Sequence, residues 1–118
     1  EISKHISKIV IEGHTDSQGF QDSKSEYENY IKNLDLSIKR AYSVSEYIVN
    51  LDYPDKNKYK NDIIRLLSTN GRSYSDPVLN NNKEDYSKSR RVELKFELND
   101  VSFVELLRKY KFQKTSEN

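Results

Sequence analysis

The chain has 118 residues, of which 34% are hydrophobic and 33% are charged. This length favours a single domain over residues 1–118, with a modest core beneath a heavily solvated surface. The 20 basic and 19 acidic residues are dispersed, which argues against nucleic acid as a partner because such binding needs a concentrated basic face. No apolar run is long enough to span a membrane, so we expect no membrane contact by this domain. The absence of cysteine excludes disulfides and thiolate metal sites.

The first recognisable element is a buried strand. Residues 9–11 are β-branched and continuous, as in a strand that is covered on both faces. Gly13 ends this strand, and Thr15 and Asp16 fall on the loop beyond it. Because ligands of open α/β sheets bind outside the carboxyl ends of strands, Asp16 is a candidate binding residue. Residues 1–6 are expected to form the last turn of a helix.

A polar stretch and then an amphipathic helix follow the strand. Residues 17–32 are poor in aliphatic side chains and predict a polar insertion beside the site. From residue 33 to residue 50, apolar side chains recur at helical steps of three and four. Arg40 lies at the edge of this stripe, where it can be held rigidly and still reach a ligand. The expected stripe consists of Leu34, Ile38, Ala41, Val44, Ser45 and Ile48.

The second half of the chain predicts two further strands. Pro54 suits the first turn of a short helix, and residues 63–68 have the composition of a buried strand closed by Gly71. A long loop is expected over residues 72–88. Residues 92–98 alternate apolar and charged side chains, which indicates a half-exposed, antiparallel strand.

The C-terminal segment, residues 99–118, is expected to form a helix and a frayed tail. Asn99 or Asp100 would cap this helix, and Val104, Leu107 and Tyr110 would face inward.

Three motifs occur in order along the chain: Gly13-His14-Thr15-Asp16, then Asn33 with Leu36-Ser37 and Arg40-Ala41, and finally Arg90-Arg91-Val92-Glu93. Together with Val44, Gly71 and Pro77, they resemble the pattern of the OmpA-like peptidoglycan-binding domain found in OmpA, Pal and MotB proteins. Each fragment is weak alone, but the ordered set is specific and covers roughly residues 9–98. The resemblance implies an α/β fold (an α+β sandwich) of alternating strands and helices packed on a mixed sheet. The first strand-helix unit of the family is not visible before Ile9, so we expect it either upstream or missing.

The resemblance also implies a function, which is non-covalent binding of the diaminopimelate in the stem peptide of peptidoglycan. Asp16 and Arg40 are carried over as the primary contacts, Asn33 and Arg90 as supporting contacts, and Thr15 and Arg91 as further ligand-binding candidates. Asp16 would accept hydrogen bonds from the ammonium of diaminopimelate, and the planar fork of Arg40 would hold the carboxylate. Of the two neighbouring arginines, one is expected to contact the ligand or Asp16 and the other to be solvated, with Arg90 favoured as the contact.

The domain would thus tether an envelope protein to the cell wall from the periplasm, with its parent anchored in the outer or the inner membrane. No catalytic residue, cofactor or metal is expected, and a homodimer is left open. Two alternative functions are retained, a MotB-type anchor of a flagellar stator and an enzyme acting on peptidoglycan.

Plainer interpretations of the same residues also stay open. Asp16 could be only a turn residue, and Arg40 could be an ordinary helix arginine or a structural partner of Asp16. His14 with Asp16 and His5 offers too few ligands for a metal site. Glu12 with Asp16 is disfavoured as a glycosidase pair because the surroundings are exposed polar loops.

Other residues depart from the family pattern or have no place in it. The interval from Asp16 to Arg40 is longer than is usual in the family, and Ser89 stands where an asparagine often precedes the paired arginines. Three aromatic residues of the insertion are open to a ligand-facing role or to pinning the loop: Phe20, Tyr27 and Tyr30.

Overall fold

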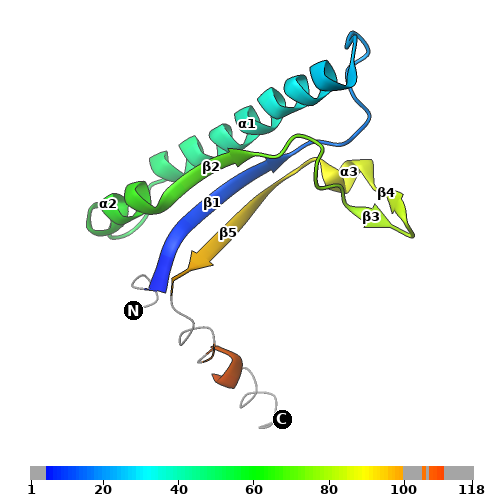
Figure 1. Cartoon of the computed structure of the whole chain (residues 1–118). Helices are drawn as coiled ribbons and strands as arrows, with labels where there is room; N and C mark the ends of the chain where they lie inside the picture. The colour runs from blue at the N-terminus through cyan, green and yellow to red at the C-terminus, as the bar shows by residue number, and fades with distance from the viewer. Residues whose placement is uncertain (1–4, 100–104, 106, 111–118) are drawn as a thin grey trace.

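The computed structural model describes residues 5–99, 105 and 107–110, in which strands alternate with helices (Figure 1). The elements in chain order are β1 (Ile6–His14), α1 (Glu26–Asn50), α2 (Lys56–Leu66), β2 (Leu67–Gly71), β3 (Leu79–Asn80), β4 (Lys83–Glu84), α3 (Tyr86–Ser89) and β5 (Arg91–Leu98). This arrangement confirms the expected α/β fold. Within the described part of the chain, no helix is both long and apolar enough to cross a bilayer.

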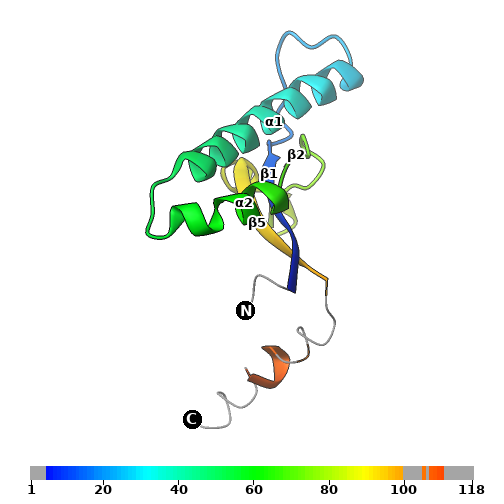
Figure 2. The same ribbon diagram turned by 90° about the vertical axis from the view of Figure 1, so that its left-hand side faces the viewer.

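Strand β1 is the centre of a three-stranded sheet, with β2 on one side and β5 on the other. It runs parallel to β2 and antiparallel to β5. Helices α1 and α2 lie to the same side of this sheet (Figure 2). Residues 10–14 of β1 are buried. The predicted strand at residues 9–11 is therefore confirmed, with Val10 and Ile11 buried and Ile9 half-buried, and so is the antiparallel strand at residues 92–98.

Helix α1 approaches the sheet closely because two glycines lie side by side beneath it. Gly13 on β1 is the cross-strand partner of Gly71 on β2. A β-carbon on Gly13 would stand 2.0 Å from the carbonyl oxygen of Ser37, and one on Gly71 would stand 2.5 Å from the Ser37 hydroxyl oxygen. Only hydrogen fits at these two positions, so the glycines set the distance between helix and sheet.

This close approach also decides which face of α1 is buried. The buried residues are small or polar: Asn33, Ser37, Ala41 and Ser45. The predicted stripe is therefore displaced, and Ile38 is 43% exposed instead of buried. The apolar period misplaced the centre of the face because Ser37 is the residue that lies over both glycines, whereas Ile38 lies beside it with its Cγ1 atom over Gly71. The hydroxyl of Ser45 forms a hydrogen bond with the hydroxyl of Thr69 on β2, at 2.8 Å.

The predicted boundaries around residues 63–68 are wrong. The strand begins only at Leu67, and the preceding four residues form the end of α2, which begins two residues after Pro54. A short continuous apolar run fits a buried strand and a helix equally well, so its pattern alone could not separate the two.

The predicted polar insertion, residues 17–32, divides into two parts. Only residues 17–25 form a loop, because α1 already begins at Glu26. Ser25 caps the helix by accepting a hydrogen bond from the backbone N–H of Glu28 at 3.1 Å. The Ser-x-x-Glu spacing of these two residues is a helix-start signal that the sequence analysis missed.

The remaining predictions concern the long loop and the two ends of the chain. Residues 72–88 contain the short hairpin of β3 and β4 and most of α3, so they are not all loop. Ile6 belongs to β1, so the expected helix over residues 1–6 is wrong there, and residues 1–4 lie outside the described residues. Asp100 and Val104 also lie outside them. Leu107 and Tyr110 are helical but 41% and 56% exposed, contrary to the expected inward orientation.

Candidate functional site

A polar hollow of about 210 Å³ lies at the carboxyl end of β1. One wall is the loop that follows β1, a second is the flank of α1, and Arg90, between α3 and β5, contributes a third. The hollow contains five of the six residues predicted as ligand-binding: Thr15, Asp16, Asn33, Arg40 and Arg90. The other lining residues are Gln18, Gly19, Phe20 and Leu36.

Asp16 is held firmly in this hollow. One carboxylate oxygen accepts a hydrogen bond from the backbone N–H of Gln18 at 3.0 Å, and the other accepts one from Arg90 Nη1. The backbone at Thr15 is fixed as well, because its N–H donates to the carbonyl of Ser73 at 2.9 Å. Each carboxylate oxygen has two lone pairs, so Asp16 retains capacity for a further donor.

Arg40 lines the same hollow and has an unpaired donor. Its Nη1 atom is buried and has no hydrogen-bond partner among the described residues. No ion pair joins Arg40 to Asp16 in this part of the chain, so the structural pairing that the sequence left open is absent there. The hydroxyl of Thr15 is likewise buried without a partner among the described residues. Two buried donors without acceptors are costly, unless a ligand or water satisfies them.

Arg91, the sixth predicted residue, is not brought to the hollow. Its guanidinium donates to Glu93 Oε1 at 2.6 Å and to the carbonyls of Ser89 at 3.1 Å and Asp76 at 3.2 Å. Arg90 lies in extended backbone between α3 and β5, and Arg91 is the first residue of β5. Successive side chains of an extended chain point to opposite sides, so the two adjacent arginines diverge. Arg90 contacts Asp16, as the favoured alternative predicted, but Arg91 is paired instead of solvated.

The family model of the OmpA family matches residues 1–91 of this sequence. The chain belongs to the OmpA family. Two crystal structures of Helicobacter pylori MotB resemble it in fold. The C-terminal domain (residues 125–256 of that protein) aligns with a TM-score of 0.54 and 19% identity over 90% of this chain and 70% of that one. The periplasmic domain (residues 90–256) aligns with a TM-score of 0.51 and 21% identity over 89% of this chain and 58% of that one. No curated protein sequence matches the chain.

The hollow of this OmpA-family chain includes residues that the sequence analysis did not select. Gln18 and Gly19 come from the inserted loop, for which the family motifs give no guidance. Phe20 lines the hollow, which agrees with the first of its two interpretations, a ligand-facing role, over pinning of the loop. Tyr27 and Tyr30 do not, since they line a separate hollow of about 350 Å³ with Glu26 and Tyr74.

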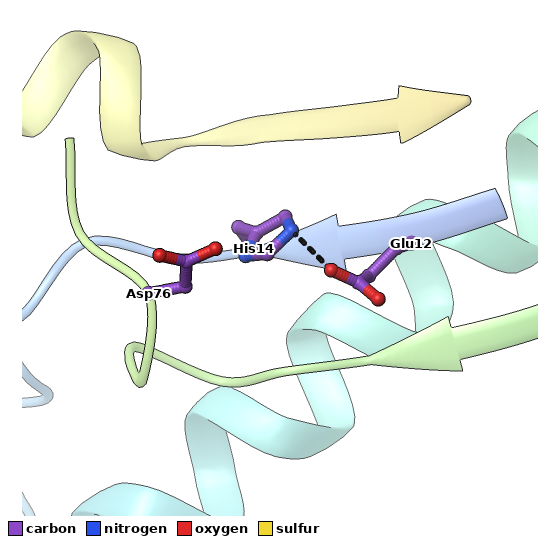
Figure 3. Close-up of side chains that lie close together, drawn as sticks. All are labelled: Glu12, His14 and Asp76. Carbon is purple, nitrogen blue, oxygen red and sulfur yellow. Dashed lines mark ion pairs between the residues drawn. The ribbon is translucent and has the colours of Figure 1, made fainter. Parts of the chain in front are cut away.

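A second charged cluster of this OmpA-family domain lies away from the hollow, around His14. Figure 3 shows the His14 ring between the side chains of Glu12 and Asp76, with Nε2 at 3.0 Å from Glu12 Oε1. One ligand atom from each residue lies within 4.8 Å of the others, so these residues are the described group best placed to hold a metal ion. Lys95 Nζ already lies 2.9 Å from Glu12 Oε1, and Arg91 lies 3.5 Å from Asp76. The side chains of Lys95 and Arg91 thus already neutralise the carboxylates that a metal ion would need. We therefore assign a structural role to the cluster, as a set of ion pairs.

The charges of this cluster shift the pKa values of its members. Burial lowers the pKa of His14, the charge of Arg91 lowers it further, and the nearby carboxylates oppose both effects without reversing them. Burial alone would raise the pKa of Glu12, but the hydrogen bond and the charge of Lys95 lower it below its usual value. Glu12 is therefore a paired structural carboxylate outside the hollow, and it does not face Asp16 as a second catalytic carboxyl.

Proposed function

We propose that this domain binds peptidoglycan non-covalently, through the amino-acid head group of diaminopimelate in the stem peptide. The observation that carries the proposal is that Arg40 and Thr15 line the same hollow as the carboxylate of Asp16, and that each has a buried side-chain donor without a hydrogen-bond partner among the described residues. Such a hollow is complementary to a group that has a carboxylate and an ammonium on one carbon.

The energetics agree with a weak but specific contact. The ligand carboxylate would accept from Arg40 and Thr15, and the ligand ammonium would donate to Asp16. Hydrogen bonds to charged groups contribute about 1.5–3 kcal/mol each. Two or three of them, after the cost of association, correspond to affinities on the order of micromolar to millimolar. Many such contacts along the wall suffice for an anchor.

The proposal extends to the place and purpose of the domain. Membership of the OmpA family and the fold of the MotB periplasmic domain support a periplasmic location and a role in tethering a parent protein to the wall. An outer-membrane anchor of the OmpA or Pal type and a stator anchor of the MotB type would use the same hollow. We therefore propose wall anchoring as the shared function of either parent.

A binding role is favoured over catalysis by the chemistry of the hollow. Among the described residues that line it, Asp16 is the one carboxylate, and it is already paired with Arg90. Glycoside hydrolysis generally uses two carboxyl groups on either side of the scissile bond. The hollow therefore supports recognition of an amino-acid head group and offers no second carboxyl for hydrolysis.

Co-sedimentation with purified, diaminopimelate-containing sacculi tests the proposal. Asp16→Ala and Arg40→Ala should each weaken binding by about 2–5 kcal/mol while the melting temperature changes little. Arg65→Ala is the matched control, because Arg65 is exposed on α2 and lies outside the hollow. Wild-type pull-down by both hollow variants would show that the residues are assigned wrongly, and release of soluble muropeptides by the intact domain would indicate an enzyme instead.

A further inference from the structure

The inserted loop, which itself lines part of the hollow, is also joined to Asn33 by hydrogen bonds through Asn29. The backbone N–H of Phe20 donates to Asn29 Oδ1 at 2.9 Å. The amide nitrogen of Asn33, a lining residue, donates to the same Asn29 Oδ1 at 3.1 Å and to the Asn29 carbonyl at 2.9 Å. Gly19 packs against the Asn29 amide so tightly that a β-carbon there would stand within 3.0 Å of it.

These contacts fix which end of the Asn33 amide is which. A backbone N–H can only donate, so the Asn29 atom that faces Phe20 must be oxygen. The atom of Asn33 that faces this oxygen and a backbone carbonyl must then be nitrogen, since two acceptors cannot bond to a third. Both amide hydrogens of Asn33 are thereby used within the described structure. The atom that Asn33 has left for the hollow is its oxygen, an acceptor.

The hollow is therefore divided into two halves of opposite character. Arg40 and Thr15 supply donors that no described residue satisfies, whereas Asn33 and Asp16 supply acceptors. A carboxylate fits the first half, and a group with N–H donors fits the second. A ligand without an ammonium would leave the Asn33 oxygen buried and unpaired. The cost of an unpaired buried acceptor exceeds the net gain from a typical hydrogen bond, so the site should discriminate strongly against such a ligand.

We propose that Asn29 is a specificity-determining positioning residue, which holds Asn33 with its acceptor toward the hollow and so makes binding depend on the ammonium of the ligand. This inference rests on the proposed function and adds a role for the inserted loop. Asn29 acts through Asn33 and has no contact with the ligand. Asn29 lies on α1 and accepts the backbone N–H of Phe20 from the inserted loop, and both residues lie outside the family motifs.

The test compares two synthetic stem tripeptides, one ending in diaminopimelate and one ending in an analogue that lacks its distal ammonium. For the wild-type chain we expect the first to bind about tenfold or more tightly. Asn33→Ala should reduce this ratio several-fold, and Asn29→Ala should reduce it in the same direction. The double variant should lose no more than Asn33→Ala alone, because the two residues act as one unit.

The controls separate positioning from general damage. Asn29→Asp keeps an acceptor oxygen at the position of Oδ1 and should retain the wild-type ratio. Asn50→Ala removes a helix asparagine whose amide donates to the carbonyl of Glu46, away from the hollow, and should leave the ratio unchanged. An unchanged ratio in Asn29→Ala, or additive losses in the double variant, would overturn the inference while the proposed function stands. If the wild-type chain binds neither tripeptide, the proposed function fails and the inference fails with it.

Discussion

The carbonyl oxygen of Ser37 lies 2.0 Å from the position that a β-carbon on Gly13 would occupy. The helix that carries Asn33 and Arg40 is therefore pressed onto the strand that carries Asp16. Asn33 precedes Ser37 by about one helical turn and Arg40 follows it by slightly less, so both flank the point of contact. The glycine and the serine of the family motifs act on the hollow indirectly, through the distance between helix and sheet.

Gly13→Ala should accordingly destabilise the whole domain. The added methyl group meets backbone, which cannot move aside, and we expect the free energy of unfolding to fall by about 1–3 kcal/mol or more. Urea unfolding followed by circular dichroism measures this change. Ser43→Ala, on the exposed side of α1, is the control and should change stability by less than about 0.5 kcal/mol. A stable Gly13→Ala variant would show that α1 does not lie as close as described.

The neighbouring residues Arg90 and Arg91 should give opposite phenotypes when each is replaced by alanine. Arg90→Ala removes the partner of Asp16 in the hollow, so sacculus binding should weaken while stability stays nearly unchanged. Arg91→Ala removes the bonds to Glu93, Asp76 and Ser89, so the free energy of unfolding should fall by about 1–3 kcal/mol while the hollow stays intact. Thermal melts and co-sedimentation of both variants measure the two effects. Equal phenotypes would contradict the separation of the two side chains.

The stability of the domain should fall as the pH falls below about 6.5. The folded-state pKa of His14 is lowered, so the unfolded chain binds a proton at a higher pH than the folded chain does. The contribution of neutral His14 is complete above the unfolded pKa and is lost as the pH drops toward the folded one. Glu12 and Glu93, whose pKa values are also lowered, add a second loss below about pH 4.5.

Urea unfolding between about pH 5 and pH 8 measures the first of these losses. His14→Tyr keeps a ring in the cluster and removes the titration in this range, so its stability should vary less with pH. His5→Gln is the control, because it removes the other histidine and keeps His14. A wild-type slope in His14→Tyr would assign the pH dependence to other groups.

Amidation of the distal carboxylate of diaminopimelate should weaken binding through the loss of the charged partner of Arg40. We expect about a tenfold or larger decrease in affinity for the wild-type chain. In Arg40→Ala, which binds weakly from the start, amidation should have little further effect. Isothermal titration with amidated and free tripeptides measures both values. An equal loss in the two proteins would place the carboxylate away from Arg40.

The family motifs carried most of the prediction of the candidate site. Thr15, Asp16, Asn33, Arg40 and Arg90 meet in one hollow because the fold joins the end of β1, the flank of α1 and the segment between α3 and β5. Their role in binding stays a proposal. The motifs could not place Gln18, Gly19 or Phe20, because these residues lie between the first two motifs.

The errors in the predicted fold arose where a local sequence pattern fits two kinds of secondary structure or two faces of a helix. The Ile63-to-Leu66 run is apolar enough for a strand, yet it completes α2, and the chain context that decides between them is tertiary. The buried face of α1 was misplaced because hydrophobicity marks Ile38, whereas the steric demand of Gly13 and Gly71 selects Ser37. The start of α1 could have been found from Ser25 and Glu28.

Asp16 and Arg90 form an ion pair in the hollow although they are 74 positions apart in the chain. The backbone hydrogen bonds within helix α1 are local, so this helix can begin to form by itself, whereas the hollow exists only after the segment that carries Arg90 has docked. A ligand of this hollow would therefore bind only the fully folded chain, and not partly folded states, and would stabilise the folded chain by mass action. Saturation with stem peptide would then report on the completion of folding, which a helical signal from α1 would not.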